Sequence, residues 1–315
     1  MIFKKQLICL AVGFSLATLF TGKSFAADEI YIPLVSKGFQ HQFWQAVKLG
    51  ADQAGKDLKV KVTFEGPETE AMVDKQIDML SSALAKKPAA IGFAALDSKA
   101  AIPLLKKAQA AHIPVVAFDS GVDSDIPVTT ATTDNKAAAS LAADKMAGLI
   151  GNAGEVALVV HDQTSRTGVD RRDGFVERIK STYPNIKIVS VQYGAGDQLK
   201  STEITKSILQ ANPNLKGIFG ANEGSAIGVL NGAKEMKRNI IIIGYDSGKQ
   251  QKDAVRSGAM AGAITQNPVG IGYKTVEAAV KALKGEKLPK IIDTGFYFYD
   301  KTNIDDPKIA AVLYD

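Results

Sequence analysis

The chain has 315 residues, of which 46% are hydrophobic and 23% are charged, and its formal net charge is +5 at pH 7. This length is sufficient for two domains, each with its own hydrophobic core. Lys4, Lys5 and Lys23 lie in an N-terminal segment without acidic residues, so the rest of the chain is closer to charge balance. That balance gives no electrostatic argument for binding nucleic acid or an anionic membrane surface.

Residues 1–26 have the pattern of a secretory signal peptide. After the first two lysines, residues 6–20 are mostly apolar, and Ser24-Phe25-Ala26 supplies small residues at a cleavage position. An uncleaved membrane anchor is the alternative, but the apolar run is short for a membrane span. The only cysteine, Cys9, would leave with the signal, so the mature protein would have no disulfide. We predict export from the cytoplasm, with cleavage near Ala26.

Short β-rich runs alternate with longer helical runs through the remaining chain. The expected strands lie at residues 30–35, 60–64, 89–94, 115–118, 128–131, 156–160, 187–191, 217–220, 240–244 and 261–265, with a further alternating strand around Tyr297 and Tyr299. The expected helices lie at residues 42–56, 69–86, 98–111, 135–150, 168–181, 199–210, 226–236, 250–257 and 269–283. Strict alternation of strand and helix predicts parallel sheets with helices on both faces, an α/β fold.

So many strands would be unusual in one sheet, so we predict two sheets of about five or six strands each. A second β-α series begins after Thr132-Thr133-Asp134-Asn135, and no disordered linker precedes it. Asp97-Ser98 predicts an N-cap for the helix that follows. Asn212-Pro213-Asn214 predicts a turn between a helix and a strand.

Polar side chains follow several of the expected strands. Asp119, Asn222, Asp246 and Gln266 each come directly after an apolar run. Ligands of parallel α/β sheets bind beyond the carboxyl ends of the strands. Carboxylates and amides at those ends offer acceptors and donors to hydroxyl groups. A turn or cap role is the alternative for Asp119 and Asp246.

A second group of candidates lies after the first strand and includes the only tryptophan of the chain. Aromatic faces of Phe43 and Trp44 could stack on a sugar ring, and Gln40 could bind its hydroxyls. Burial of both aromatics in the core is the alternative, and His41 could be a capping or surface residue.

Arg171 and Arg172 lie early in an expected helix. One guanidinium could turn towards a cleft and donate to ligand oxygens, or both could form charge pairs at the surface. Because adjacent positions on a helix point in different directions, we expect the two arginines to differ in role.

The sequence has no pattern typical of covalent, nucleotide or metal chemistry. It lacks a Gly-x-Ser-x-Gly elbow, a phosphate-binding Gly-x-x-x-x-Gly-Lys loop and a Gly-x-Gly-x-x-Gly turn after the first strand, and its three histidines are scattered. We therefore predict no enzyme activity, no cofactor and no metal site. An acid/base pair of Asp119 and Asp246 in a sugar-cleaving enzyme is the alternative.

Several segments together resemble the type I periplasmic solute-binding proteins of ABC sugar importers, the ribose-binding-protein group. The similar segments are residues 113–119, Arg171 with Gly174-Phe175, and residues 218–223, 243–246 and 264–266. The resemblance covers essentially the whole mature chain. It implies that the sugar is hydrogen-bonded by Asp119, Arg171, Asn222, Asp246 and Gln266 and stacked on by Phe43 and Trp44.

The chain departs from the ribose binders at three positions of that pattern. Gln40 or His41 falls where the family has an asparagine contact, Ser120 replaces a second arginine, and Gly196 replaces an aromatic residue. The last two departures imply a roomier or less cationic pocket, and they argue against ribose itself.

The resemblance also implies two Rossmann-like lobes joined by a three-segment hinge. The N-terminal lobe would comprise residues 27–133 and 267–294, and the C-terminal lobe residues 134–266 and 295–315. A neutral monosaccharide or polyol would bind between them by hinge closure. The closed form, a monomer, would then dock on an ABC permease at the inner membrane.

Other readings remain open at this point. Residues 62–70 and Asp162-Gln163 are similar to the autoinducer-2 binders of the same superfamily, which makes a small furanose an alternative ligand. The same fold could serve a chemoreceptor or a sensor kinase. A regulator of the LacI type shares the fold, but an export signal stands where its helix-turn-helix would be. The sequence does not assign roles to Lys37, Asp162 and Gln163.

Overall fold

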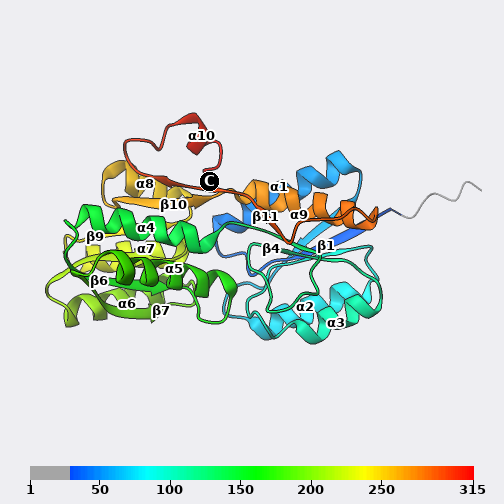
Figure 1. Ribbon diagram of the computed structural model, residues 1–315, viewed down its shortest axis with the longest axis horizontal. Coiled ribbons are helices and arrows are strands. Elements are labelled where there is room, and N and C mark those ends of the chain that lie inside the picture. Colours follow the sequence, from blue (N-terminus) through cyan, green and yellow to red (C-terminus); the bar gives the residue numbers. More distant parts are fainter. Residues whose placement is uncertain (1–28) are drawn as a thin grey trace, which may run out of the picture.

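The computed structural model describes residues 29–315, and the predicted signal peptide lies outside the described residues. The described chain forms two α/β lobes, each built around a six-stranded sheet (Figure 1). This confirms the predicted fold class of two lobes with mainly parallel sheets. Within residues 29–315, no helix is long and apolar enough to cross a membrane.

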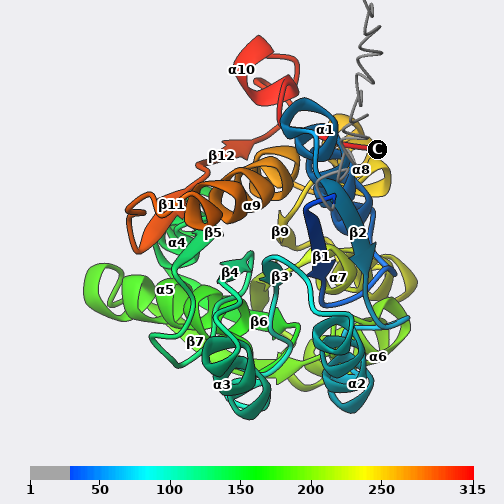
Figure 2. The same cartoon turned by 90° about the vertical axis from the view of Figure 1, so that its right-hand side faces the viewer.

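The first lobe contains a sheet in which all neighbouring strands are parallel. Its strands are β1 (Tyr31–Val35), β2 (Lys61–Glu65), β3 (Ile91–Phe93), β4 (Val115–Phe118), β5 (Thr129–Thr132) and β11 (Ile291–Asp293), in the order β11-β5-β4-β3-β1-β2. Helices α1 (Gln42–Leu58) and α9 (Pro268–Leu283) cover one face, and α2 (Val73–Ala85) and α3 (Ile102–Ala110) cover the other (Figure 2).

Two glycines allow α1 and α9 to pack closely. A Cβ atom on Gly50 would lie 1.9 Å from the carbonyl oxygen of Val269, and one on Gly272 would lie 1.9 Å from that of Val47. Neither position can hold a side chain in this packing, so the two backbones touch directly. This contact fixes α1, whose first turn lies at the junction of the lobes.

The second lobe has the same layered plan, with one antiparallel edge strand. Its strands are β6 (Gly154–Val160), β7 (Ile186–Tyr193), β8 (Leu215–Gly220), β9 (Ile241–Tyr245), β10 (Gly262–Gln266) and β12 (Phe296–Tyr299), in the order β12-β10-β9-β8-β6-β7. Only β12 runs antiparallel to its neighbour, β10. Helices α4 (Asn135–Leu149) and α5 (Arg166–Thr182) pack on one face, and α6 (Gln198–Ala211), α7 (Glu223–Glu235) and α8 (Lys249–Ser257) pack on the other.

The chain passes between the two sheets three times. The passages lie between β5 and α4, between β10 and α9, and between β11 and β12. The C-terminal tail, which includes α10 (Pro307–Ala310), then returns to the junction of the lobes. There the Tyr314 ring lies 6.2 Å from that of Phe43, and its hydroxyl accepts a hydrogen bond from the amide of Ser247.

All the strands and helices expected from the sequence are present, and the short helix α10 is an unexpected addition. Three further details differ. Helix α3 begins at Ile102, because Asp97 accepts hydrogen bonds from the amides of Lys99 and Ala100 and so closes a turn instead of capping the helix. Helix α2 begins at Val73, four residues after its expected start. Strand β11 was not expected, because it is only three residues long and mostly exposed.

Candidate functional site

A cavity of about 260 Å³ lies between the two lobes. Each lobe supplies six of its lining residues, and none of the twelve is more than 8% exposed. The lining residues are Lys37, His41, Phe43, Trp44, Glu70 and Asp119 from the first lobe and His161, Thr167, Arg171, Asn222, Asp246 and Gln266 from the second. A small, buried site lined by polar and aromatic side chains of both lobes suits a small molecule.

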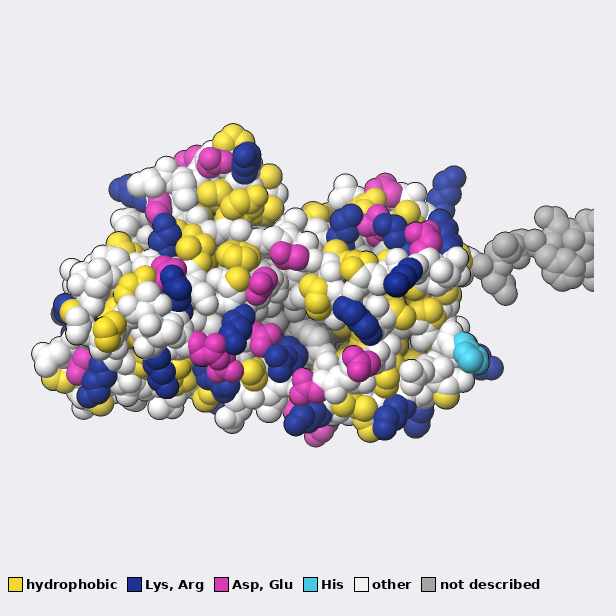
Figure 3. Space-filling view, viewed as in Figure 1, with side chains coloured by type: hydrophobic (Ala, Val, Ile, Leu, Met, Phe, Trp, Pro, Cys, Tyr) yellow, Lys and Arg dark blue, Asp and Glu magenta, His cyan; other side chains and the backbone are white. Residues whose placement is uncertain are grey.

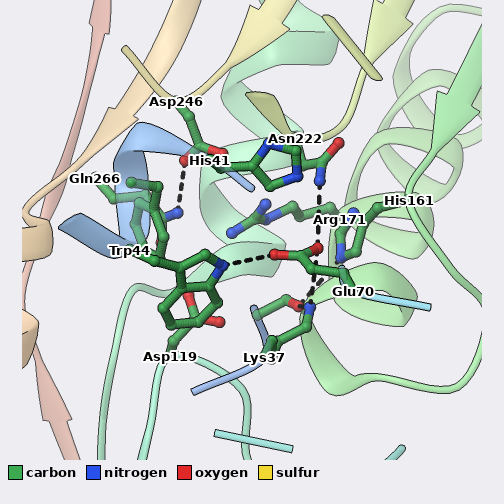
Figure 4. A pocket seen from close by; sticks show the side chains of 12 residues that line it. Lys37, His41, Trp44, Glu70, Asp119, His161, Arg171, Asn222, Asp246 and Gln266 are labelled. Atoms are coloured by element: carbon green, nitrogen blue, oxygen red, sulfur yellow. Dashed lines mark hydrogen bonds and ion pairs between the residues drawn. The ribbon is translucent and has the colours of Figure 1, made fainter. Parts of the chain in front are cut away.

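Charged side chains of both signs surround the junction of the lobes on the face shown in Figure 3. The cavity itself lies beneath that surface, and its lining is mostly polar (Figure 4). A buried, polar site gives strong hydrogen bonds to any ligand that matches its donors and acceptors.

Two carboxylates at strand ends face this cavity. Asp119 follows β4 and Asp246 follows β9, and both have left-handed backbone conformations, with φ of 54° and 79°. The Asp246 carboxylate accepts hydrogen bonds from the amide of Glu223 at 3.0 Å and from Nε2 of Gln266 at 2.7 Å. Burial raises the pKa of Asp246. Asp246 is therefore oriented by its own lobe before any ligand binds.

Asp119 has a different environment. Among the described residues, none donates a hydrogen bond to its carboxylate, although the side chain is only 4% exposed. Burial raises its pKa to about 6, against the opposing influence of Lys37 and Arg171. A buried carboxylate without partners is unfavourable. It is a ready acceptor for donors brought by a ligand.

Phe43 and Trp44 lie in the first turn of α1 and meet edge to face, with ring centroids 5.0 Å apart. Both belong to the hydrophobic core of the first lobe, and both also line the cavity. Burial in the core and contact with the cavity, which were alternatives in the sequence analysis, are therefore both true of these two side chains. Nε1 of Trp44 donates to Oε1 of Glu70 at 2.8 Å.

Arg171 lies on the cavity-facing side of α5, and Arg172 does not. The Arg171 guanidinium is centred 3.7 Å from the Tyr245 ring, and its Nε donates to Oδ1 of Asn135 at 2.7 Å. Arg172 instead bonds Asp173 next to it. The expected difference between the two arginines is confirmed.

Four lining residues were not identified as site residues from the sequence: Lys37, Glu70, His161 and Thr167. Nζ of Lys37 lies 3.3 Å from Oγ1 of Thr167 and 3.8 Å from carboxylate oxygens of both Glu70 and Asp162. His161 directly follows the buried strand β6 and Lys37 follows β1 by two residues, so the strand-end pattern was the available signal for these two. Gln163, which had been considered beside Asp162, is exposed and does not line the cavity.

Two expected contact residues, Gln40 and Ser120, do not line the cavity. Oε1 of Gln40 accepts the amide of Glu70 at 2.6 Å, and its Nε2 donates to the carbonyl of Gly196 at 3.5 Å. Ser120 is fully buried in the bend that follows β4. Among the described residues, its hydroxyl has no hydrogen-bond partner.

The site is not roomier at Gly196, contrary to the expectation. A Cβ atom there would lie 3.0 Å from Nδ2 of Asn222, 3.2 Å from Oε2 of Glu70 and 3.3 Å from Nε2 of His41. These side chains already fill the space that a larger residue would occupy. Lys37 also supplies a second buried cation beside Arg171, which offsets the missing arginine at Ser120.

Several buried polar atoms of the lining have no hydrogen-bond partner among the described residues. They are Nδ1 and Nε2 of His41, Nδ1 of His161 and Oε1 of Gln266. Burial and the nearby Lys37 lower the pKa of His161, so its imidazole is neutral. Because buried polar groups are nearly always paired in folded proteins, the cavity is complementary to a polar molecule. In the described part of the chain, no cluster of His, Cys, Asp and Glu could hold a metal ion.

Comparison with known proteins identifies the family. Residues 32–287 match a family model described as the periplasmic binding protein domain. The chain belongs to the periplasmic binding protein family. The resemblance to the ribose-binding-protein group is thereby confirmed, together with its expected fold.

Individual relatives of this periplasmic binding protein cover nearly its whole length. It is 28% identical to the D-allose-binding periplasmic protein of Escherichia coli, over 88% of this chain and 90% of that one. It is 26% identical to the ribose import binding protein of the same organism, over 90% of this chain and 94% of that one.

Solved structures agree. A carbohydrate transporter solute-binding protein from Agrobacterium radiobacter in complex with D-arabinose is 35% identical, with a TM-score of 0.87, over 91% of this chain and 99% of that one. An ABC transporter solute-binding protein from Agrobacterium vitis with bound D-fucose is also 35% identical, with a TM-score of 0.87, over 90% and 100% of the two chains.

In the periplasmic binding protein described here, each lobe caps a helix of the other. His41, at the N-cap of α1, makes no capping hydrogen bond. The Glu223 carboxylate accepts the amides of Gln42 and Phe43 instead, each at 3.2 Å. In return, Oε1 of Gln42 accepts the amide of Lys249, at the start of α8, at 2.8 Å. Opening the lobes would break both caps, so they stabilise the closed form.

Replacing Glu223 with Ala should therefore favour the open form of the ligand-free protein. An N-cap contributes about 0.5–2 kcal/mol, so the ratio of closed to open molecules should fall roughly 2- to 30-fold. Distances between fluorescent labels on the two lobes would measure this. Glu235→Ala is the matched control, because Glu235 lies at the exposed end of the same helix. Unchanged distances in Glu223→Ala would contradict the capping role.

Proposed function

We propose that this protein captures a neutral monosaccharide or polyol between its lobes and delivers it to an ABC permease at the inner membrane. The observation that carries the proposal is the closed cavity, to which each lobe contributes six side chains. Its unpartnered donors and acceptors match the alternating hydroxyls of a sugar, and its aromatic pair matches the apolar ring face. The proposed contact residues are His41, Phe43, Trp44, Asp119, Arg171, Asn222, Asp246 and Gln266.

Closure is the proposed mechanism. The three passages between the sheets would act as the hinge, with residues 27–133 and 267–294 moving against residues 134–266 and 295–315. A sugar that touches both lobes binds the closed form more tightly than the open form, and this difference shifts the population towards closure. The permease would then recognise the closed surface.

The names of the relatives favour this reading over the alternatives. They refer to the sugars D-allose, ribose, D-arabinose and D-fucose, and one refers to import. This supports a sugar over an autoinducer-2-like furanose, and a permease over a chemoreceptor or sensor kinase. We further propose that the signal peptide is removed near Ala26, and that the mature protein is a monomer without enzyme activity.

A thermal-shift screen followed by calorimetry tests the proposal. The mature protein would be screened against D-arabinose, D-fucose, D-allose, D-ribose, D-xylose, D-glucose, D-galactose and xylitol. A ligand that binds only the folded state raises the melting temperature. At a ligand concentration of one hundred times its Kd, the free energy of unfolding increases by about 2.7 kcal/mol. We expect a large shift with at least one sugar or polyol. No shift with any of them would overturn the proposal.

Sugar affinity should weaken below neutral pH. Ligand hydroxyls would donate to the ionised Asp119 carboxylate, whose pKa in the empty site is raised to about 6 by burial. Protonation removes that acceptor, so Kd should rise as pH falls through 6, by about tenfold from pH 7 to pH 5. Calorimetry across this range should also detect proton release on binding. A Kd that stays constant from pH 7 to pH 5 would contradict this role of Asp119.

A further inference from the structure

Glu70 is the acidic side chain that reaches the cavity from a loop instead of a strand end. It lies between β2 and α2, yet it is only 8% exposed. Its carboxylate accepts a hydrogen bond from Nε1 of Trp44 at 2.8 Å and another from Nδ2 of Asn222, in the opposite lobe, at 3.5 Å. Nζ of Lys37 lies 3.8 Å away (Figure 4). Three donors that would otherwise face a ligand are thus directed at Glu70.

Two neighbouring residues, Gln40 and Gly196, fix the position of Glu70. Oε1 of Gln40 accepts its amide at 2.6 Å, which pins the loop. Gly196 leaves the space that Oε2 of Glu70 occupies, because a Cβ there would lie 3.2 Å from it. Burial alone would raise the pKa of Glu70, but the positive charge of Lys37 and the neighbouring groups lower it to about 2. Glu70 is therefore a fixed, ionised wall of the cavity.

This wall limits the size of the ligand because the side chains that line the cavity are all buried. No lining side chain is more than 8% exposed, so a group added to a bound ring at the Glu70 end would meet protein while the lobes are closed. At the Glu70 end, the carboxylate already receives hydrogen bonds from both lobes. An extra hydroxyl there would have to displace one of them and leave its donor unpaired.

We infer that Glu70 is a specificity-determining residue that restricts the ligand to ring sugars without an exocyclic hydroxymethyl group, such as pentoses and 6-deoxy sugars. This inference rests on the proposed function and deepens it. Replacing Glu70 with Ala removes four heavy atoms beyond Cβ, which is more than the two heavy atoms of a hydroxymethyl group. It also frees the donors of Trp44, Asn222 and Lys37 for the added hydroxyl.

Three sugar pairs that differ in this group test the inference: D-fucose with D-galactose, D-xylose with D-glucose, and D-ribose with D-allose. Calorimetry would give the ratio of affinities within each pair. For the pair that binds best, the wild-type protein should prefer the smaller member by roughly 10- to 200-fold, the range that one small group is worth in a tight pocket. Glu70→Ala should reduce that ratio at least tenfold, whatever its effect on overall affinity.

Further variants separate shape from charge. Glu70→Gln keeps the shape of the side chain and should keep the preference. Glu70→Asp, which is one carbon shorter, should weaken it and serves as the test if Glu70→Ala does not fold. Glu68→Ala is the matched control, because Glu68 lies in the same loop and is exposed.

The outcomes distinguish the two proposals. If the wild-type protein binds one of these sugars but Glu70→Ala, or Glu70→Asp in its place, keeps the wild-type ratio, the role of Glu70 is wrong and the proposed function stands. A wild-type preference for the larger member of the pair would also overturn that role. If the wild-type protein binds none of the sugars or polyols tested, the proposed function fails and the inference fails with it.

Discussion

Replacing Asp119 with Asn should make the ligand-free protein more stable and its sugar binding weaker. Charged hydrogen bonds contribute about 1.5–3 kcal/mol each, so the loss of one should raise Kd roughly 10- to 200-fold. The stability effect has the opposite sign because the carboxylate lacks partners in the empty site. A residue that binds the ligand through a group left without hydrogen-bond partners in the empty site lowers the stability of the ligand-free protein.

The size of the stability effect follows from the pKa of Asp119. One pKa unit corresponds to about 1.4 kcal/mol, so a rise from 3.8 to about 6 makes ionisation of the folded protein unfavourable by about 3 kcal/mol. The folded state holds this proton more tightly than the unfolded state. The Asp119 carboxyl therefore makes its full contribution to the free energy of unfolding below pH 3.8, and this contribution is lost as pH rises through 6.

Urea denaturation of wild-type protein and Asp119→Asn at pH 7 and pH 4.5 would measure this effect. The variant should be the more stable protein at pH 7, and the difference should shrink at pH 4.5. Asp125→Asn is the control, because Asp125 is an exposed acid a few residues further along the same loop. Equal destabilisation of Asp119→Asn at both pH values would show that the carboxylate has a structural partner.

Replacing Trp44 with Ala should have the largest effect on stability, a loss of about 3–5 kcal/mol. The side chain is 1% exposed and packs edge to face against Phe43 and Phe118. Its removal leaves a void in the core of the first lobe and deprives the Glu70 carboxylate of its shortest hydrogen bond. Sugar affinity should fall as well, because the same ring lines the cavity.

The matched variant is Trp44→Phe, which keeps an aromatic ring but not the Nε1 donor. It should lose less stability than Trp44→Ala, and we expect about 1–3 kcal/mol from the hydrogen bond that Oε1 of Glu70 loses. Equilibrium unfolding in urea measures both variants. Because Trp44 is the only tryptophan in the chain, its emission in the wild-type protein should also change on sugar binding. Equal stability of Trp44→Ala and wild-type protein would contradict the packing argument.

Much of the fold follows from local patterns. Apolar runs of strand length alternate with helical periods, and this was sufficient to predict every element except β11 and the four-residue helix α10. Strand β11 is short and exposed, so it carries no hydrophobic pattern; pairing with β5 defines it. The sequence predicted Asp97 as the N-cap of a helix, but its side chain closes a turn before that helix. A side chain that closes a turn and one that caps a helix have the same sequence signature.

The strand-end pattern predicted one part of the cavity. Asp119, Asn222, Asp246 and Gln266 all line it, because the carboxyl ends of parallel strands meet at one edge of a sheet. Glu70 comes from a loop and Thr167 from the first turn of a helix, and neither position has a periodicity that marks it. Gln40 and His41 are adjacent in the sequence, and only the direction of α1 decides that His41 lines the cavity while Gln40 holds Glu70.

The alternation of strands and helices, the two sheets and the polar residues at the strand ends all follow from the amino-acid sequence. These features depend on hydrophobic periods and on the geometry of parallel sheets, which act over a few residues at a time. The pairing of side chains across the two lobes follows from the folded arrangement alone. The contacts of Glu70 with Asn222, of Lys37 with Thr167 and of Glu223 with α1 join residues 152, 130 and about 180 positions apart. No local pattern encodes such contacts, because they form only when two independently folded surfaces close on each other.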